Sequence, residues 1–172
     1  MKKRDVDMLQ GALLPNIIRF AVPDIPSAKS LCEIAARTSM PLVADIHFDY
    51  KLALECLKGN VAKIRINPGN IGDFSNVEKV ANACAKRNVP IRIGVNSGSV
   101  EKDLLLKYGG ATPEAMAESA FRHIELLEKC DFYNTVVSIK SSDVTKMVKA
   151  YRLVAEKCDY PLHLGVTEAG TE

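Results

Sequence analysis

Two segments, KIRINPGNIG (residues 63–72) and IRIGVNSGS (residues 91–99), decide the fold because apolar and polar residues alternate in both. In the first, Ile64 and Ile66 alternate with Arg65 and Asn67, and in the second isoleucines flank Arg92. Successive residues of a β-strand point to opposite faces of its sheet. Strands that helices cover on both faces are instead apolar throughout. We therefore predict a sheet with helices on one face and charged side chains on the other.

Strand-like runs recur along the rest of the chain, and helical stretches separate them. Six strands are predicted, at residues 17–22, 42–48, 63–67, 91–96, 134–140 and 162–167. Regular alternation of strand and helix requires parallel strands with right-handed crossovers. With one charged inner face, the pattern predicts an α/β fold of the (β/α)8 TIM-barrel type. It is present as an incomplete barrel of about six βα units, since eight strands need about 250 residues.

Capping residues mark where the predicted helices begin. Asp49 is expected to cap the helix after the second strand, and Ser75 or Asn76 the next one. Thr112, followed by proline and glutamate, opens a long helix, and Asp143 precedes the last one. Residues 97–113 form an insertion between the fourth strand and its helix. Each predicted helix therefore falls between two predicted strands.

The composition is that of one folded domain without a polyanionic partner. The 172 residues are 47% hydrophobic, and 23 basic residues against 21 acidic ones leave a net charge of +2. This balance excludes a dedicated nucleic-acid binder. The opening MKKRDVDMLQ lacks the apolar core of a signal peptide, and no run reaches the ~18 apolar residues of a membrane span. The sequence predicts a cytoplasmic protein with no membrane segment and no nucleic-acid partner.

Charged and amide side chains gather on the predicted inner face, mostly toward the carboxyl ends of the strands, where a barrel builds its active site. Four cations there face only Asp45 and Glu168, which leaves a surplus of positive charge. The surplus favours a multiply charged anion such as a phosphate or diphosphate. Gly-containing turns at 67–72 and 95–99 offer backbone N–H groups to the same anion. The candidate residues are Arg19, Asp45, His47, Arg65, Asn67, Arg92, Asn96 and Lys140.

The cysteines and the remaining histidines indicate no metal site. Asp45 and His47, two apart on one strand, lack a third ligand at matching spacing. His163 alternates onto the inner face, where we expect a hydrogen-bonded ring, and His123 is expected at the surface or its boundary. The cysteines form no CxxC pair and are interpreted as small buried residues. They are Cys32, Cys56, Cys84, Cys130 and Cys158.

The motifs LVADIHFD, KIRINPGNIG, IRIGVNSGS, VSIKSSD and LHLGVTEAG occur in this order. From about residue 17 to the end, the chain closely resembles the barrel domain of the 4-hydroxy-3-methylbut-2-enyl diphosphate synthase family. The resemblance implies an oxidoreductase of the methylerythritol phosphate route to isoprenoids. Such an enzyme reductively opens 2-C-methyl-D-erythritol 2,4-cyclodiphosphate, with two electrons delivered by a 4Fe-4S cluster. It also implies ferredoxin or flavodoxin as electron donor, and a homodimer.

The same resemblance implies roles for individual residues. Four cations are expected to contact the phosphates, and these are Arg19, Arg65, Arg92 and Lys140, with Ser141 assisting Lys140. Other residues are expected to line the site as hydrogen-bond partners, and these are Asp45, His47, Asn67 and Asn96. Glu168 matches a glutamate that faces the cluster and protonates the departing hydroxyl. That placement requires the last strand to break near Thr167.

The match is partial, and residues 1–172 are expected to form a single partial barrel domain. The opening residues stand where the family has its first strand and helix, and the eighth strand is missing. The iron–sulfur domain with its cysteine ligands is absent from this chain. We therefore expect the ligands of the 4Fe-4S cluster outside these residues, and we expect the fragment by itself to be inactive.

Two other functions fit a charged inner face. A class I aldolase would use Lys140 as a Schiff-base lysine, which borohydride would trap with a carbonyl substrate. The three arginines argue against it because they favour a more highly charged anion. A non-catalytic interaction domain would bind no ligand, and neutralising its inner-face charges would leave its function intact.

Overall fold

The computed structural model describes residues 16–166, in which parallel strands alternate with helices. The strands are β1 (Ile18–Ala21), β2 (Leu42–Asp45), β3 (Lys63–Ile66), β4 (Ile91–Asn96) and β5 (Thr135–Lys140). Each strand pairs in parallel with the next, so their order in the sheet is that of the sequence. A doubly wound sheet reverses its strand order at a switch point, whereas a barrel does not. The predicted α/β barrel type, present as an incomplete barrel, is confirmed.

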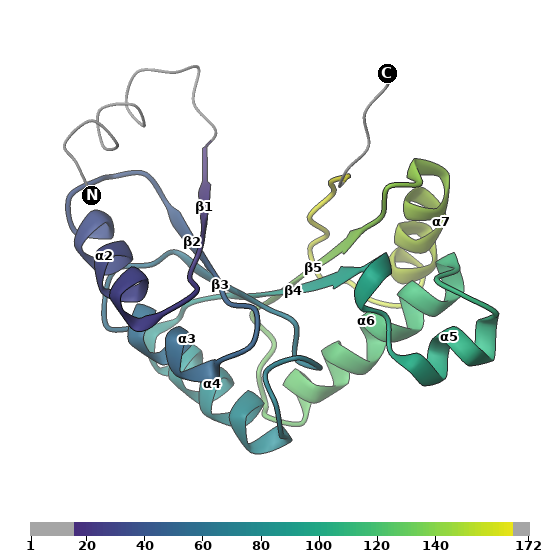
Figure 1. The fold of residues 1–172 in the computed structure, drawn as a ribbon, viewed down its shortest axis with the longest axis horizontal. Coiled ribbons are helices and arrows are strands. Elements are labelled where there is room, and N and C mark those ends of the chain that lie inside the picture. The colour runs from purple at the N-terminus through teal and green to yellow at the C-terminus, as the bar shows by residue number, and fades with distance from the viewer. Residues whose placement is uncertain (1–15, 167–172) are drawn as a thin grey trace.

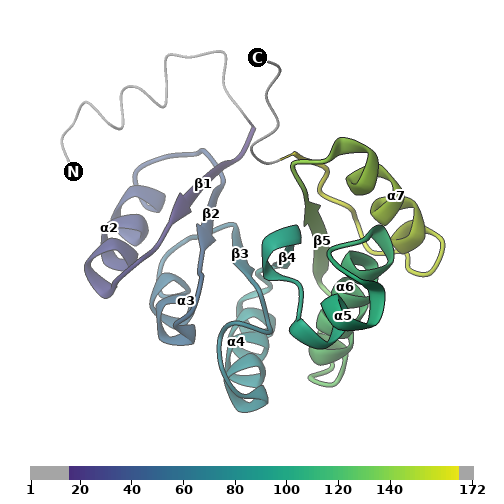
Figure 2. The same ribbon diagram turned by 45° about the vertical axis from the view of Figure 1, so that its right-hand side comes forward.

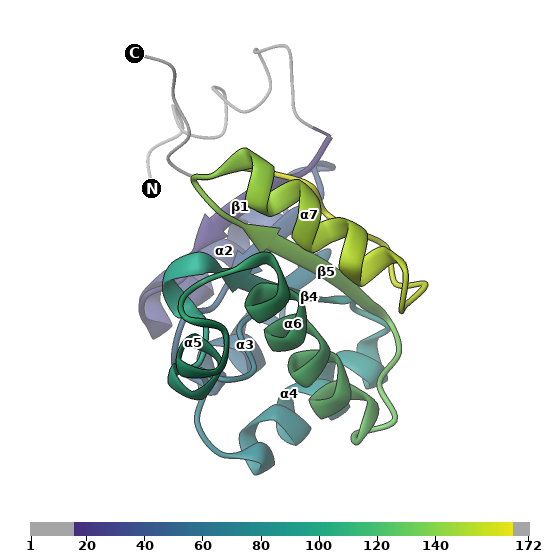
Figure 3. The same ribbon diagram turned by 90° about the vertical axis from the view of Figure 1, so that its right-hand side faces the viewer.

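Helices cover one face of this sheet. They are α2 (Ile25–Ala35), α3 (Tyr50–Cys56), α4 (Phe74–Arg87), α5 (Lys102–Tyr108), α6 (Pro113–Glu128) and α7 (Val144–Ala155). Figures 1 and 2 show the strands as an open, curved wall with the helices outside it. At the β5 end, α5, α6 and α7 lie side by side (Figure 3). None of the helices within residues 16–166 is long and apolar enough to cross a membrane.

The alternation in the strands separates the core from the inner face. Ile64, Ile66, Ile91 and Ile93 are fully buried between the sheet and the helices. Burying one such side chain stabilises the fold by roughly 1.5 to 3 kcal/mol relative to leaving it exposed. The residues between them in sequence, such as Arg65, point to the concave face. The core therefore fixes which side chains the inner face can present.

Three helices begin where the sequence predicts. Asp49 accepts a hydrogen bond from the N–H of Lys51 at 2.9 Å, and Asp143 accepts one from the N–H of Lys146 at 3.0 Å. Thr112 caps α6 in the same way. Such a cap satisfies an N–H group that the first helical turn leaves unpaired.

The start of α4 and the insertion differ from the expectation. The helix begins after Asp73, so the prediction that Ser75 or Asn76 caps it was wrong. The side chain of Asn76 instead donates from Nδ2 to the carbonyl of Ile71 at 3.2 Å, and so holds the preceding turn. The insertion at residues 97–113 contains a short 3-10 helix (Ser97–Ser99), α5, and the turn before α6.

The predicted sixth strand is reduced to one bridge, between Val137 and Leu162, and its final residue lies outside the described range. The N–H of His163 donates to the carbonyl of Val137 at 2.8 Å. A continued ladder would next join the N–H of Ile139 to the carbonyl of His163. The hydroxyl of Tyr151 takes that place, since it accepts from Ile139 at 2.8 Å and donates to His163 at 2.5 Å. The inserted hydroxyl separates the two chains and ends the pairing.

Candidate functional site

The carboxylate of Asp45 lies on the inner face at the last residue of β2. Nη1 of Arg65 donates to Oδ1 at 3.0 Å, and Nε of Arg19 lies 3.4 Å from Oδ2. Nε2 of His47 lies 3.7 Å from the same oxygen. The side chains of Asp45 and Arg65 are only 6% and 8% exposed. One buried carboxylate therefore holds side chains from three consecutive segments of the sheet.

Arg65 crosses the inner face directly over Gly94 of the neighbouring strand. Nη2 of Arg65 donates to the carbonyl of Gly94 at 3.3 Å. A Cβ atom on Gly94 would lie 2.3 Å from Nε of Arg65, well inside van der Waals contact. The guanidinium of Arg65 can occupy this position because residue 94 is glycine and has no side chain.

A cavity of about 370 Å³, here called the Asp45 cavity, opens on this face. Six predicted residues line it, namely Arg19, Asp45, His47, Arg65, Asn96 and Lys140. Ser97 and Gly98 complete its lining, although the sequence indicated only that they belong to a turn. The lining carries three obligate or near-obligate cations against one carboxylate, which is the charge balance that suits an anion.

A second, smaller cavity of about 170 Å³, here called the Arg92 cavity, shares Arg19 and Lys140 with the first. Arg92 is 5% exposed, and its Nε has no hydrogen-bond partner among residues 16–166. The ion pairs of Asp45 go to Arg19, His47 and Arg65, and no described ion pair includes Arg92. Burial, and then the nearby Arg19 and Arg65, lower the pKa of Arg92. Within the described residues, Arg92 is a buried cation without a carboxylate partner.

His163 lies on the inner face as expected and makes hydrogen bonds there. Nη1 of Arg92 donates to Nε2 of His163 at 3.2 Å, and Nδ1 lies 3.4 Å from Oγ of Ser138. Burial, and then the charge of Arg92, lower the pKa of His163. Because the guanidinium can only donate, this contact requires Nε2 to act as an acceptor. His163 therefore orients Arg92 without neutralising it.

Two predicted site residues line neither cavity, and a third falls outside the described residues. Oδ1 of Asn67 accepts from the N–H of Gly69 at 3.1 Å, and Oγ of Ser141 accepts from the N–H of Asp143 at 3.1 Å. Neither Asn67 nor Ser141 lines the two cavities. Glu168 lies outside the described residues. Asn67 and Ser141 shape the loops after their strands rather than the cavity walls.

One residue of the site was not predicted from the sequence, and the burial of another residue was misjudged. Lys63 lines the Arg92 cavity, and its strand phase, two residues before Arg65, is a signal that could have found it. His123 was expected near the surface, and that prediction was wrong because the side chain is 2% exposed. It follows Met116 and Ala120 at helical spacing and therefore falls on the core-facing stripe of α6.

Two of the five cysteines are buried as the sequence suggests, and the other three are less buried than expected. Cys56 and Cys84 are buried, and the other three are partly buried. Burial raises the pKa of Cys56 and of Cys84 to about 12, so both remain thiols. Among residues 16–166, no three His, Cys, Asp or Glu side chains lie close enough together to hold a metal ion.

The fold and the site define a class of protein, an α/β barrel domain whose inner face carries a cluster of cations around one carboxylate. The sequence places the chain within that class. Residues 7–172 match the family model described as the GcpE TIM-barrel domain, and the chain belongs to this family.

Curated relatives carry one name, 4-hydroxy-3-methylbut-2-en-1-yl diphosphate synthase (flavodoxin). The protein of Maridesulfovibrio salexigens is 58% identical over 156 residues, which is 91% of this chain and 44% of the relative. That of Clostridium perfringens is 55% identical over 156 residues, 91% of this chain and 45% of the relative. This chain thus spans less than half the length of these relatives. The resemblance seen in the motifs is confirmed.

Proposed function

We propose that this chain is the substrate-binding barrel portion of an oxidoreductase of isoprenoid biosynthesis. In this proposal, the intact enzyme uses two electrons to convert 2-C-methyl-D-erythritol 2,4-cyclodiphosphate into 4-hydroxy-3-methylbut-2-enyl diphosphate, and a hydroxyl leaves as water. The names of the relatives support the reaction. The choice of ligand rests on Arg92, which is buried and has no carboxylate partner among residues 16–166. Such a cation is costly unless an anion compensates it.

The two cavities suit a ligand with two linked phosphoryl groups. Arg19 and Lys140 border both cavities, while Arg65 lines one and Arg92 the other. A compact diphosphate would therefore meet cations from four strands. Asp45 already holds the guanidinium of Arg65 in place, so little conformational freedom remains to be lost when an anion binds.

The family implies a 4Fe-4S cluster, and the described residues do not fit it. A cluster needs three or four converging thiolates, whereas no such group of ligands exists within residues 16–166. We therefore place the ligands of the cluster outside this chain and assign these residues only to the binding of the substrate. The relatives' printed names support flavodoxin as the electron donor of the intact enzyme.

Lys140→Met in the intact enzyme should weaken binding of the cyclic diphosphate without destabilising the fold. The lost charge-assisted contact is worth about 1.5 to 3 kcal/mol, or roughly ten- to a hundredfold in Kd. Burial, and then Arg19, Arg92 and Arg65, lower the pKa of Lys140 below that in the unfolded chain. The charge of Lys140 therefore costs the folded state some stability relative to the unfolded chain, so its removal should leave Tm unchanged or raise it.

Calorimetric titration with the cyclic diphosphate and a thermal scan measure both effects. Lys146→Met is the matched control, since Lys146 is exposed on α7 and makes only a 3.9 Å contact with Asp143. The control should bind normally. An unchanged Kd in Lys140→Met would remove the anion site from the proposal.

Glu168 is proposed as the residue that protonates the departing hydroxyl. Glu168→Gln keeps the size and hydrogen-bonding capacity but removes the proton, so Kd should stay constant. The value of kcat should fall by about a hundredfold, the lower end of what a general acid contributes. Steady-state kinetics alongside titration with the cyclic diphosphate separate the two quantities. Normal turnover would exclude Glu168 from the mechanism.

The aldolase alternative draws support from one observation, the lowered pKa of Lys140. An amine of lowered pKa is a better Schiff-base nucleophile. The names of the relatives favour the synthase instead. Borohydride reduction in the presence of a small carbonyl compound decides the matter, because only an aldolase would gain mass at Lys140. The homodimer and the cytoplasmic location also remain proposals, the first of which sedimentation of the intact enzyme would test.

A further inference from the structure

His123 is a buried histidine that the proposed chemistry does not use. It lies on α6, outside the sheet, and is 2% exposed. Its Nδ1 has no hydrogen-bond partner among the described residues. A buried polar group normally has a partner, because an unpaired one costs free energy. A histidine at this position therefore calls for a reason other than packing.

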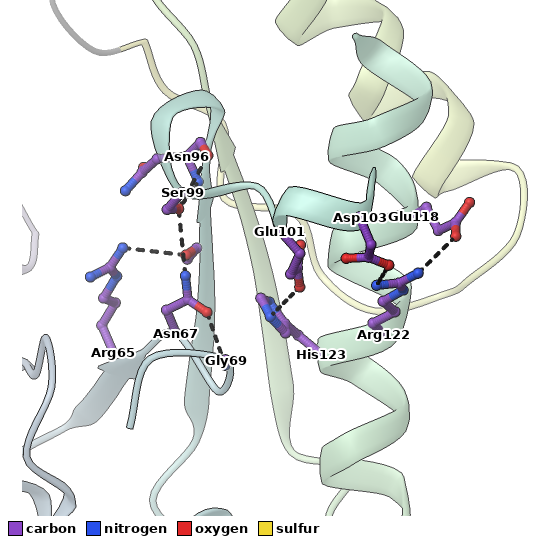
Figure 4. A network of polar contacts seen from close by, with 11 residues as sticks. Arg65, Asn67, Gly69, Asn96, Ser99, Glu101, Asp103, Glu118, Arg122 and His123 are labelled. Carbon is purple, nitrogen blue, oxygen red and sulfur yellow. Dashed lines mark hydrogen bonds and ion pairs between the residues drawn. The ribbon is translucent and has the colours of Figure 1, made fainter. Parts of the chain in front are cut away.

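The ring of His123 touches two of the loops that follow the strands. Nε2 lies 3.1 Å from Oε1 of Glu101, at the end of the β4–α5 loop, as Figure 4 shows. The two groups do not have the geometry of a well-aligned hydrogen bond. On its other side the ring meets the β3–α4 loop, since a Cβ atom on Gly69 would lie 2.9 Å from Nε2. His123 therefore contacts both loops at once.

The same two loops are joined directly on the side facing the site. Asn67 accepts from the N–H of Gly69, and its Nδ2 donates to Oγ of Ser99 at 3.5 Å. Oγ of Ser99 in turn accepts from the N–H of Asn96 at 3.2 Å and donates to its carbonyl at 3.1 Å. Asn96 lines the Asp45 cavity. These contacts are drawn in Figure 4.

Together the contacts close a ring that runs from Gly69 through Asn67, Ser99, Glu101 and His123 back to Gly69. Ser97 and Gly98, which line the Asp45 cavity, lie next to this ring, between Asn96 and Ser99. A shift of His123 would therefore reach the cavity lining through Ser99, from both loops.

We propose that His123 and Glu101 are a positioning pair, which holds the β3–α4 and β4–α5 loops against α6 and thereby sets the shape of the anion site. The pair touches neither cavity, so it acts only through the loops. The inference rests on the proposed function where Kd and kcat/KM are measured, but the measurement of hydrogen exchange in the two loops does not depend on it.

Energetics favour a positioning role over a purely stabilising one. His123 is buried and Glu101 is partly buried, and a pair of this kind contributes little more to stability than apolar side chains of the same volume would. It does restrict geometry, because only one arrangement of the loops brings both partners together. Burial by itself raises the pKa of Glu101, but the nearby His123 and Ser119 side chains outweigh it and lower the pKa to about 2. Glu101 is thus ionised at neutral pH and available to His123.

The test compares variants of the intact enzyme that contains this chain. His123→Phe keeps the ring volume without polar atoms, and His123→Gln restores an amide near the position of Nε2. Arg122→Met is the matched control, since the next residue of α6 pairs with Asp103 at 2.7 Å and Glu118 at 3.4 Å on the outer surface. Hydrogen exchange at residues 67–70 and 97–101 is measured together with Kd for the cyclic diphosphate and kcat/KM.

In His123→Phe, exchange in both loops should rise roughly tenfold or more while the strands stay protected. The value of kcat/KM should fall roughly ten- to a hundredfold, as for a small misplacement of binding groups. His123→Gln should restore most of the loop protection and most of kcat/KM. Arg122→Met should change neither the exchange rates nor kcat/KM. If His123→Phe fails to fold, Glu101→Gln, which keeps the shape and removes the charge, is judged by the same criteria.

Unchanged exchange in both loops would overturn the inference, and so would faster exchange with normal Kd and kcat/KM. These outcomes differ from failure of the proposed function. If Lys140→Met bound the cyclic diphosphate normally, the proposed anion site would be wrong. Hydrogen exchange in the two loops would still show whether His123 holds them in place.

Discussion

Replacing Asp45 with alanine is expected to lower the free energy of unfolding by about 3 to 5 kcal/mol, the usual effect of removing one partner from a buried ion pair. Arg65, 8% exposed, would keep only the carbonyl of Gly94 as a partner. Arg19 would lose its contact with the same carboxylate. With the only described carboxylate contact of these arginines gone, their charges would repel one another across the inner face.

Urea denaturation of the intact enzyme measures this loss, with an unchanged m value showing that the unfolded state is unaffected. Glu118→Ala is the matched control. Glu118 also has three partners, Lys107, Tyr108 and Arg122, but its side chain is far more exposed, at 29%. An exposed network of this kind contributes about 0 to 1 kcal/mol. Equal losses in the two variants would show that burial of Asp45 is not what matters.

The double variant Asp45→Leu with Arg65→Met should recover much of the stability that Asp45→Ala loses. Replacing a buried pair by apolar side chains of similar volume is often neutral. The double variant should nevertheless fail to bind the cyclic diphosphate, because the cavity would then lack one of its cations. The double variant would thus regain stability without regaining ligand binding. That result would show that the ion pair serves the binding site rather than the stability of the fold.

The 172-residue chain expressed by itself is expected to bind no 4Fe-4S cluster and to show no reductive ring opening. Its cysteines lie near the carboxyl ends of different helices, and those ends face away from the carboxyl ends of the strands. Cys32 and Cys56 are neighbours, with Sγ of Cys32 3.4 Å from the carbonyl of Cys56, but a cluster needs three or four thiolates.

Anaerobic reconstitution with iron and sulfide, followed by iron analysis and a visible spectrum, checks this expectation. The intact enzyme treated in parallel is the control and should become coloured. The isolated chain should still bind the cyclic diphosphate if it folds as described. Stoichiometric iron in the isolated chain, or turnover by it, would show that the thiols can converge and that the cluster ligands were misplaced.

The sheet and most of the site could be predicted because strand alternation is a local signal. Ile64 and Ile66 must point opposite to Arg65 wherever the strand lies, so the apolar face fixes the inner one. Parallel strands then bring Arg19, Asp45 and Lys140 to one face without further information. The type of fold and the charge of the cavity follow from residues that are close in sequence.

What the sequence could not predict depends on contacts between distant segments. The hydroxyl of Tyr151 interrupts the ladder of β5 from a helix, and nothing in its helical spacing distinguishes it from a core tyrosine. The burial of His123 depends on how α6 faces the loops after β3 and β4. Asn67 has the strand phase of a site residue, but its side chain turns into its own loop at the point where β3 ends.

The fit of Arg65 over Gly94 makes the glycine depend on the arginine in evolution. Because a Cβ atom would lie 2.3 Å from Nε, a mutation from glycine to any larger residue cannot spread while the arginine keeps its place. The reverse does not hold, since losing the arginine frees the glycine to change. In a set of barrels of this kind, residue 94 therefore records whether selection still maintains the site. A side chain there would mark a lineage in which no arginine crosses the inner face at this point.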